Sequence, residues 1–160
     1  MGSLRVILLV LLTIIAEPVQ ADSPVPFTSD GCSAFPNGTY RQPDLWLHCC
    51  ILHDFDYWKG GSFRSRIDSD NRLEQCVNKT GQDEVALLML AGVRLGGSPY
   101  IPSPFRWGYG WPYPKLYGPL DPCEKGQLSK LTVKLSQDHR ALLNNEITQL
   151  AADALDCANE

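Results

Sequence analysis

Two neighbouring residues, His53 and Asp54, have the side chains in this 160-residue sequence that best suit catalysis. They lie in the run LWLHCCILHDFDYWKGG, which is compatible with a helix. Residues three or four apart share one helix face, and here these are Trp46, Cys49 or Cys50, His53 and Tyr57. Asp54 is turned by about 100° from that face. A titratable imidazole on a cysteine-anchored face, beside a carboxylate that points to an adjacent groove, indicates an active site.

A histidine that acts as a general base needs a carboxylate to hold its tautomer and to stabilise the imidazolium. Asp68 and Asp70, in the next predicted helix, are the candidates. If Cys76 bonds to Cys49, Asp70 lies six residues before that bridge and can reach back toward His53. The alternative is that His53 is a core histidine and both aspartates are solvated. Spacing alone favours neither interpretation.

Asp54 together with backbone carbonyls forms a ligand set that suits a hard cation such as Ca²⁺. The segment SDGCSAFPNG around Cys32 has the Gly, Asn and Pro residues of a tight turn, and Asp30 adds a second carboxylate. If Cys32 bonds to Cys50, this segment lies directly beneath Asp54. The alternative is that the segment is only a loop, which is the commoner role of such a composition.

Two other chemistries are disfavoured. Zinc bound through Cys49, Cys50 and His53 fits poorly with an oxidising compartment, and the chain has no C-x-x-C pair. The sequence also lacks a G-x-S-x-G motif, so no serine nucleophile is predicted.

The N-terminal residues indicate export. Arg5 precedes an apolar run over residues 6–15, and Val19-Gln20-Ala21 is a small-x-small cleavage site. Residues 1–21 are therefore expected to be a secretory signal peptide, too short to span a membrane. Residues 22–160 would be the mature domain, secreted or extracytoplasmic, and periplasmic in a Gram-negative source. The net charge of −4 argues against nucleic acid as a partner and against strong attraction to anionic membranes.

The cysteine count predicts a disulfide framework. All six cysteines follow the expected cleavage point: Cys32, Cys49, Cys50, Cys76, Cys123 and Cys157. An even number in a small secreted chain indicates three disulfides, and about fifteen connectivities are open.

Sequence patterns predict a mostly α fold without strands or repeats. Pro43 can begin a helix that runs to Trp58 and ends at Gly60-Gly61. Ser62 can cap a second helix that ends near Lys79. A third helix is expected over residues 82–95 and a last, amphipathic helix over residues 129–158.

Residues 98–122 are rich in proline and aromatic residues and predict a long loop. Its aromatic residues include Phe105, Trp107, Tyr109, Trp111, Tyr113 and Tyr117. Such residues suit a lipid–water interface, but packing over the helices is the favoured interpretation. Arg94 and Arg106 could meet an anionic head group, although solvated arginines are commoner.

Two segments, at Asn37 and Asn78, fit the N-glycosylation pattern. They matter only in a source that glycosylates. A glycan on Asn37 would lie on the predicted cation loop, so we interpret that match as fortuitous.

The run from Cys49 to Tyr57 fits the pattern C-C-x-x-H-D-x-x-Y. This pattern resembles the active-site helix of the secreted phospholipase A2 superfamily. Asp70, six residues before Cys76, resembles the second helix of that family. Asp30-Gly31-Cys32 is similar to the calcium loop of microbial members. The resemblance covers roughly residues 30–77, within a core over residues 30–97, and implies a disulfide-stapled phospholipase A2-like fold with two antiparallel active-site helices.

The resemblance also implies a mechanism and a substrate. His53 would activate a water molecule, Asp70 would orient the imidazole, and Tyr57 would hydrogen-bond Asp70. The substrate would be the sn-2 ester of a glycerophospholipid at a membrane or micelle interface.

The cofactor implied is Ca²⁺, which would polarise the ester carbonyl and stabilise the oxyanion. Its ligands would be Asp54, carbonyls near Gly31 and Ser33, and the Asp30 side chain. The disulfides implied are Cys32–Cys50 and Cys49–Cys76, which leaves Cys123–Cys157.

The sequence departs from the family pattern in two places. Residues 33–36 replace the glycine-rich calcium loop of animal members, and Arg66-Ile67-Asp68 resembles a string in some microbial members, so Asp68 competes with Asp70. The cysteine spacing favours Asp70. Two other functions stay open: a non-catalytic secreted binding or toxin-like module of the same fold, and a disulfide scaffold whose aromatic loop binds protein.

Overall fold

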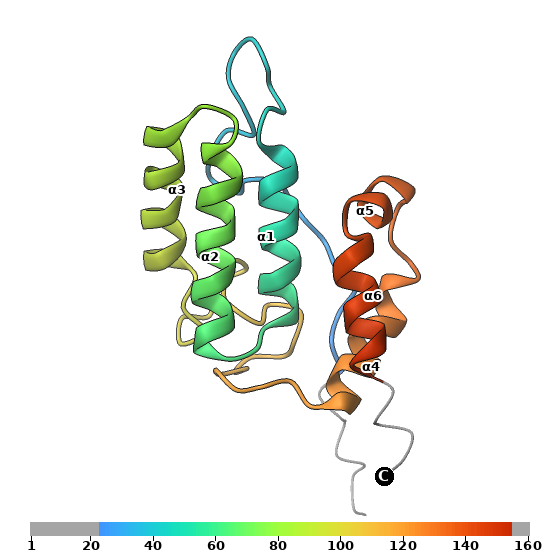
Figure 1. The fold of residues 1–160 in the computed structure, drawn as a ribbon. Coiled ribbons are helices and arrows are strands. Elements are labelled where there is room, and N and C mark those ends of the chain that lie inside the picture. Colours follow the sequence, from blue (N-terminus) through green and yellow to red (C-terminus); the bar gives the residue numbers. More distant parts are fainter. Residues whose placement is uncertain (1–22, 155–160) are drawn as a thin grey trace, which may run out of the picture.

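The structure, a computed structural model, describes residues 23–154, which form helices and no strand (Figure 1). The helices are α1 (Leu47–Lys59), α2 (Phe63–Asn78), α3 (Asp83–Gly96), α4 (Pro122–Thr132), α5 (Gln137–Leu142) and α6 (Asn144–Ala152). The predicted mostly α fold is confirmed. The expected signal peptide lies outside the described residues. Among the helices described, none combines the length and the apolar character needed to cross a bilayer.

The described helices form two groups of three. In the first group, α1, α2 and α3 lie side by side, and α2 packs against both neighbours (Figure 1). In the second group, α4 packs against α6, and α5 contacts α1. The segment that leads from Ser23 toward α1, blue in Figure 1, passes between the two groups.

The apolar core is divided in the same way, and α1 contributes to both parts. One cluster joins α1 to α2 and α3: Trp46, Cys49, Cys50, Leu73, Val77, Ala86 and Met89. The other joins α1 to the N-terminal segment, the long loop and the C-terminal helices: Phe27, Phe55, Trp58, Trp111, Leu128, Leu143 and Leu150. Phe55 and Trp58 are fully buried, and burying a side chain of this size contributes about 1.5–3 kcal/mol.

The first helix begins at Leu47, so the predicted start at Pro43 is wrong. The reason lies in Trp46, whose backbone N–H donates to the carbonyl of Asn37 at 3.0 Å. Its indole N–H donates to the carbonyl of Pro36 at 2.7 Å. These bonds fasten the chain before Leu47 to the preceding loop. Ser62 does cap α2, because its hydroxyl accepts from the Ser65 N–H, as predicted.

A single helix over residues 129–158 is also wrong, as far as the described residues extend. The segment is divided among α4, α5 and α6. Asp121 starts α4 earlier than predicted, through a capping box with Glu124. Ser136 then accepts from the His139 N–H and caps a new helix. A good capping residue inside an amphipathic pattern therefore divides it.

The loop between α3 and α4 packs around the C-terminal end of α1. The last carbonyls of a helix have no partner within it, and here the loop supplies donors. The backbone N–H groups of Gly108 and Gly110 donate to the carbonyls of Tyr57 and Trp58. The Trp111 indole donates to the Lys59 carbonyl at 2.8 Å.

The aromatic residues of this loop divide into two sets. Trp107 and Trp111 are buried, in agreement with the packing interpretation. Phe105 and Tyr113 remain about half exposed. Only the first set therefore belongs to the core.

We expect Gly110→Ala to destabilise the protein, because an added Cβ would lie 2.4 Å from Trp58 Cδ1 and 2.6 Å from the Trp58 carbonyl oxygen. Forced overpacking of this kind costs about 1–3 kcal/mol. Gly118→Ala, in the same loop, is the control, because no atom lies within 4 Å of its added Cβ. Thermal unfolding should show a lower Tm for Gly110→Ala only. Equal melting temperatures for the two variants would contradict the packing described.

Candidate active site

A cleft of about 940 Å³ opens between α1, α3 and two loops. Its floor is formed by α1, including His53, Asp54 and Tyr57. Its walls come from residues 28–35 before α1, from α3 and from residues 103–109. The cleft therefore collects the predicted histidine and the predicted cation loop in one place, and α3 and the long loop add apolar walls.

His53 and Asp70 lie in direct contact across α1 and α2. Nε2 of His53 is 3.1 Å from Oδ1 of Asp70, and both residues are buried. A carboxylate only accepts hydrogen bonds, so Nε2 is the donor, and in the neutral imidazole Nδ1 then carries the lone pair. The Tyr57 hydroxyl donates to the same Oδ1 at 2.7 Å. These contacts are the ones that the sequence interpretation placed between the three residues.

Two arginines lie against the other oxygen of Asp70. Arg94 Nε is 2.8 Å from Oδ2, and Arg66 Nε is 3.9 Å from it. Neither Oδ2 nor Arg94 Nε has an aligned hydrogen-bond partner, so the 2.8 Å contact acts through charge. Because Asp70 is fully buried, this positive charge offsets the cost of removing the carboxylate from water.

Arg66 connects the site to three other elements. Its Nε donates to the Tyr57 hydroxyl at 3.1 Å, and its Nη1 donates to the Tyr117 hydroxyl at 2.6 Å. Its Nη2 donates to the carbonyls of Val93 and Arg94, each at 2.9 Å. The guanidinium therefore links α2 to the end of α3 and to the long loop. It also donates to Tyr57, whose hydroxyl in turn donates to Asp70.

The structure separates the two competing aspartates. The Asp68 carboxylate is about half exposed and pairs with Arg64 at 3.6 Å, away from His53. The two arginines considered for a head group also have other partners. Arg94 pairs with Asp70. Arg106 is buried and donates to the carbonyls of Gly108 and Trp111, so both guanidinium groups already have partners within the protein.

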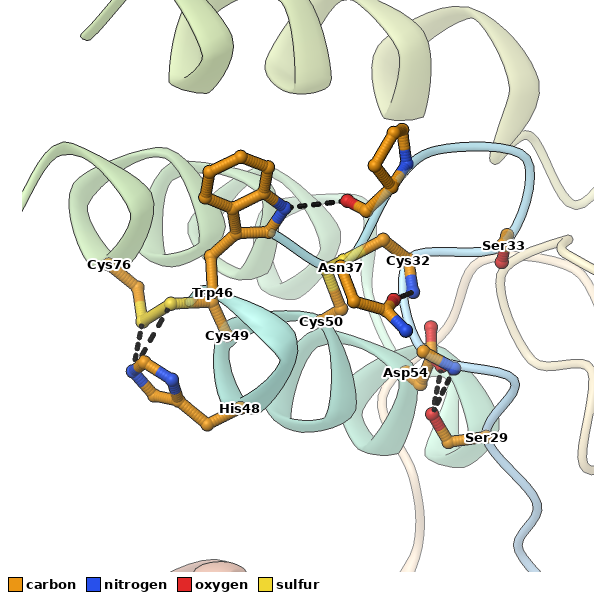
Figure 2. Close-up of a disulfide and its surroundings, with 12 residues drawn as sticks. Ser29, Cys32, Ser33, Asn37, Trp46, His48, Cys49, Cys50, Asp54 and Cys76 are labelled. Atoms are coloured by element: carbon orange, nitrogen blue, oxygen red, sulfur yellow. Dashed lines mark hydrogen bonds between the residues drawn. A yellow bond between two sulfur atoms is a disulfide. The ribbon is translucent and has the colours of Figure 1, made fainter. Parts of the chain in front are cut away.

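The predicted cation loop lies beside Asp54. The Ser29 hydroxyl donates to Oδ2 of Asp54 at 2.6 Å and accepts from the Gly31 N–H, as Figure 2 shows for the Ser29–Asp54 pair. Gly31 has a positive φ of 80°, and Ser33 one of 56°. The Asp30 carboxylate is exposed and accepts from the Ser33 hydroxyl at 2.9 Å.

Asp54 is in an unusual electrostatic environment. Burial raises its pKa from 3.8 to about 7, the Ser29 hydrogen bond opposes that rise, and the negative charge of Asp30 adds to it. The pKa of the Tyr109 hydroxyl is also raised, mainly by burial and in addition by the negative charges of Asp54 and Asp30. Within residues 23–154, no basic side chain lowers the pKa of Asp54, so the protein compensates the carboxylate form of this residue poorly.

A divalent cation fits this donor set. The available donors are hard oxygen atoms: the carboxylates of Asp54 and Asp30, the hydroxyl of Ser29, and the backbone carbonyls of residues 31–33. The pKa of Asp54 is raised mainly by burial and to a smaller extent by the charge of Asp30, and a bound cation would oppose both effects by stabilising the carboxylate form. The residues present are therefore compatible with the Ca²⁺ site implied by the sequence.

Disulfides fix both halves of the site to α1. Cys32–Cys50 joins the predicted cation loop to α1, and Cys49–Cys76 joins α2 to α1. Both pairings agree with those implied by the sequence resemblance. Cys123 is disulfide-bonded as well, and its predicted partner lies outside the described residues.

A second group of possible metal ligands is formed by His48, Cys49 and Cys76, whose ligand atoms lie within 4.8 Å of one another. Both sulfurs belong to the Cys49–Cys76 disulfide. Thiolates are the sulfur ligands of zinc, so this cluster is no zinc site in the oxidised protein.

No family model, curated protein or solved structure matches this chain. The function is therefore inferred from the residues of the site and their geometry.

Three residues have contacts in the site that the sequence did not predict: Arg66, Arg94 and Ser29. Arg66 precedes Asp70 by four positions, a helical spacing that could have indicated a pair. Arg94 reaches Asp70 from another helix, and Ser29 reaches Asp54 from the N-terminal loop. No local pattern signals such long-range contacts.

The raised pKa of Asp54 predicts a pH-dependent effect of Asp54→Asn in a metal-free buffer. Between about pH 4 and pH 7 the folded protein binds more protons than the unfolded chain at this residue, so its contribution to stability falls as pH rises through this window. Asparagine removes this loss, so the variant should gain in Tm relative to wild type at pH 8 compared with pH 4. Asp44→Asn, at an exposed position, is the control. The same difference in Tm at both pH values would contradict the raised pKa.

Proposed function

We propose that this protein is a secreted, calcium-dependent hydrolase of the phospholipase A2 type, which cleaves the sn-2 ester of glycerophospholipids. The observation that carries the proposal is the His53–Asp70 contact of 3.1 Å at the floor of an open cleft, with Asp54 as the next residue. A base, its orienting carboxylate and a cation-binding carboxylate are together the parts that water-mediated ester hydrolysis requires.

His53 acts as the general base. Its Nδ1 accepts a proton from water as the water oxygen attacks the ester carbonyl carbon. The imidazolium that forms is stabilised by Asp70 through Nε2, while Tyr57 keeps the carboxylate in position. When the carbon–oxygen bond to the glycerol breaks, the imidazolium returns its proton to the leaving oxygen. The products are a fatty acid and a lysophospholipid.

Calcium, when bound, supplies the positive charge that polarises the ester carbonyl and stabilises the oxyanion. Asp54 would hold it, together with the Asp30 side chain and carbonyls near Gly31 and Ser33. The Cys32–Cys50 disulfide keeps this loop at α1, so the carboxylates stay next to the base.

The walls of the cleft suit acyl chains. Phe35, Leu88, Met89, Val93 and Phe105 line it. Leu88 and Phe105 are also about half exposed, so apolar surface continues out of the cleft onto the molecular surface. A substrate with apolar chains attached to a polar ester would find both parts of the site in the same cleft.

We predict that the mature oxidised protein releases fatty acid from mixed phospholipid micelles, and that release requires both Ca²⁺ and His53. His53→Ala should lower the rate by about 10²–10⁴-fold, the usual contribution of a general base. Ca²⁺ should also raise the Tm of wild type but not of Asp54→Asn. His139→Ala, which changes a histidine on α5 away from the cleft, is the control. No release and no Ca²⁺-dependent change in Tm would leave a binding module instead of an enzyme.

A second prediction distinguishes the two aspartates of α2. Asp70→Asn should lower the rate by roughly 10²–10⁴-fold, because the base loses the acceptor that fixes its tautomer. It should also lower the free energy of unfolding by about 3–5 kcal/mol, because the charges of Arg66 and Arg94 lose their buried partner. Asp68→Asn should change neither quantity. Rates are compared well below each Tm, and a loss of activity in Asp68→Asn alone would reverse the assignment.

A further inference from the structure

The Cys49–Cys76 disulfide has an imidazole beside both of its sulfurs. Nε2 of His48 lies 3.4 Å from Sγ of Cys49 and 3.5 Å from Sγ of Cys76. Figure 2 shows the His48 ring directed at the disulfide from one side. His48 is exposed, and neither the hydrolase mechanism nor the core uses it. In the described part of the chain, no imidazole nitrogen lies within hydrogen-bonding distance of the Cys32–Cys50 sulfurs.

The two sulfurs differ in access. Cys49 is 1 % exposed, whereas Cys76 is partly exposed. Thiol–disulfide exchange begins when a thiolate reaches one sulfur along the S–S axis and displaces the other. Cys76 is therefore the more accessible residue for an external thiolate, and attack there makes Cys49 the leaving group.

The two sulfurs also differ in their ability to carry negative charge. Cys49 is the third residue of α1, a 13-residue helix, and the N-terminal turn of a helix stabilises a thiolate. Cys76 is the third residue from the end of α2, where the helix dipole disfavours a thiolate. Access and the helix dipoles thus favour the same direction of cleavage, and the His48 imidazole, whose Nε2 lies within 3.5 Å of both sulfurs, is placed to stabilise the sulfur that leaves.

We propose that Cys49–Cys76 is a site of thiol–disulfide exchange with small-molecule thiols of the glutathione class, with His48 as the group that stabilises the leaving sulfur. The thiolate attacks Sγ of Cys76 and forms a mixed disulfide there. The S–S bond breaks, and its electron pair leaves on Cys49 as a thiolate beside the imidazolium of His48. A second thiolate then attacks the mixed disulfide, so that two thiols are oxidised to one external disulfide and Cys49 and Cys76 are reduced.

The exchange has a consequence for the hydrolase site that rests on the proposed function. Besides the short backbone connection, the Cys49–Cys76 disulfide is a covalent cross-link between α1 and α2. These two helices carry His53 and Asp70, respectively. Opening the bridge removes the covalent restraint on that pair while Cys32–Cys50 still holds the cation loop.

The test uses the full mature oxidised protein and reduced glutathione. Free thiols are trapped at intervals with N-ethylmaleimide, and peptides are analysed by mass spectrometry. We expect glutathione on Cys76, N-ethylmaleimide on Cys49, and slower opening of Cys32–Cys50, which serves as the internal control. His48→Gln should slow the opening of Cys49–Cys76 by roughly threefold to tenfold, as expected for a less stabilised leaving thiolate, and leave the rate at Cys32–Cys50 unchanged.

Three results would overturn the proposal: glutathione on Cys49, an unchanged rate in His48→Gln, or opening of Cys49–Cys76 no faster than that of Cys32–Cys50. The first and third are measured on the wild-type chain, so they do not depend on how the variant folds. The readout is a covalent adduct, so a protein without hydrolase activity gives the same answer. If the oxidised wild-type protein releases no fatty acid at all, that result contradicts the proposed function and leaves the exchange proposal unaffected.

Discussion

The buried carboxylate of Asp70 is the group around which the site is organised. An ionised side chain with no exposed surface is costly unless every direction around it supplies charge or a donor. Asp70 meets His53 and Tyr57 at one oxygen and two guanidinium groups at the other. These partners come from α1, α2 and α3, so the need to satisfy one carboxylate fixes how three helices pack.

The carboxylate next to the predicted cation loop, Asp54, has no such positive partners among the described residues. Asp54 lies beside Asp30 and is bonded to a neutral hydroxyl rather than to a cationic side chain. Its carboxylate is therefore poorly compensated by the protein itself. Asp70 on α2 and Asp54 on α1 thus have opposite electrostatic environments, because positive charge lies against Asp70 and none offsets the burial of Asp54 in the described residues.

The sequence was sufficient where spacing alone determines geometry. The shared helix face of His53 and Tyr57 follows from that spacing, but the choice of Asp70 as their partner needed the family resemblance, which implied the Cys49–Cys76 bridge. The role of Arg94 could not, because its partner lies on another helix and no periodic pattern connects them. The helices after Asp121 were missed for a local reason: capping residues interrupt an otherwise continuous amphipathic pattern.

The contact between Arg66 and Tyr117 means that the long loop is not an independent insertion. Tyr117 packs edge-on against the partly exposed rings of Phe63 and Tyr100, while its hydroxyl accepts from the arginine that supports Tyr57. These contacts limit how the loop can be changed in an engineered variant. A shortened or transplanted loop would have to provide a hydroxyl for Arg66 and donors for the carbonyls at the end of α1, so a change in the loop also affects α1 and α2.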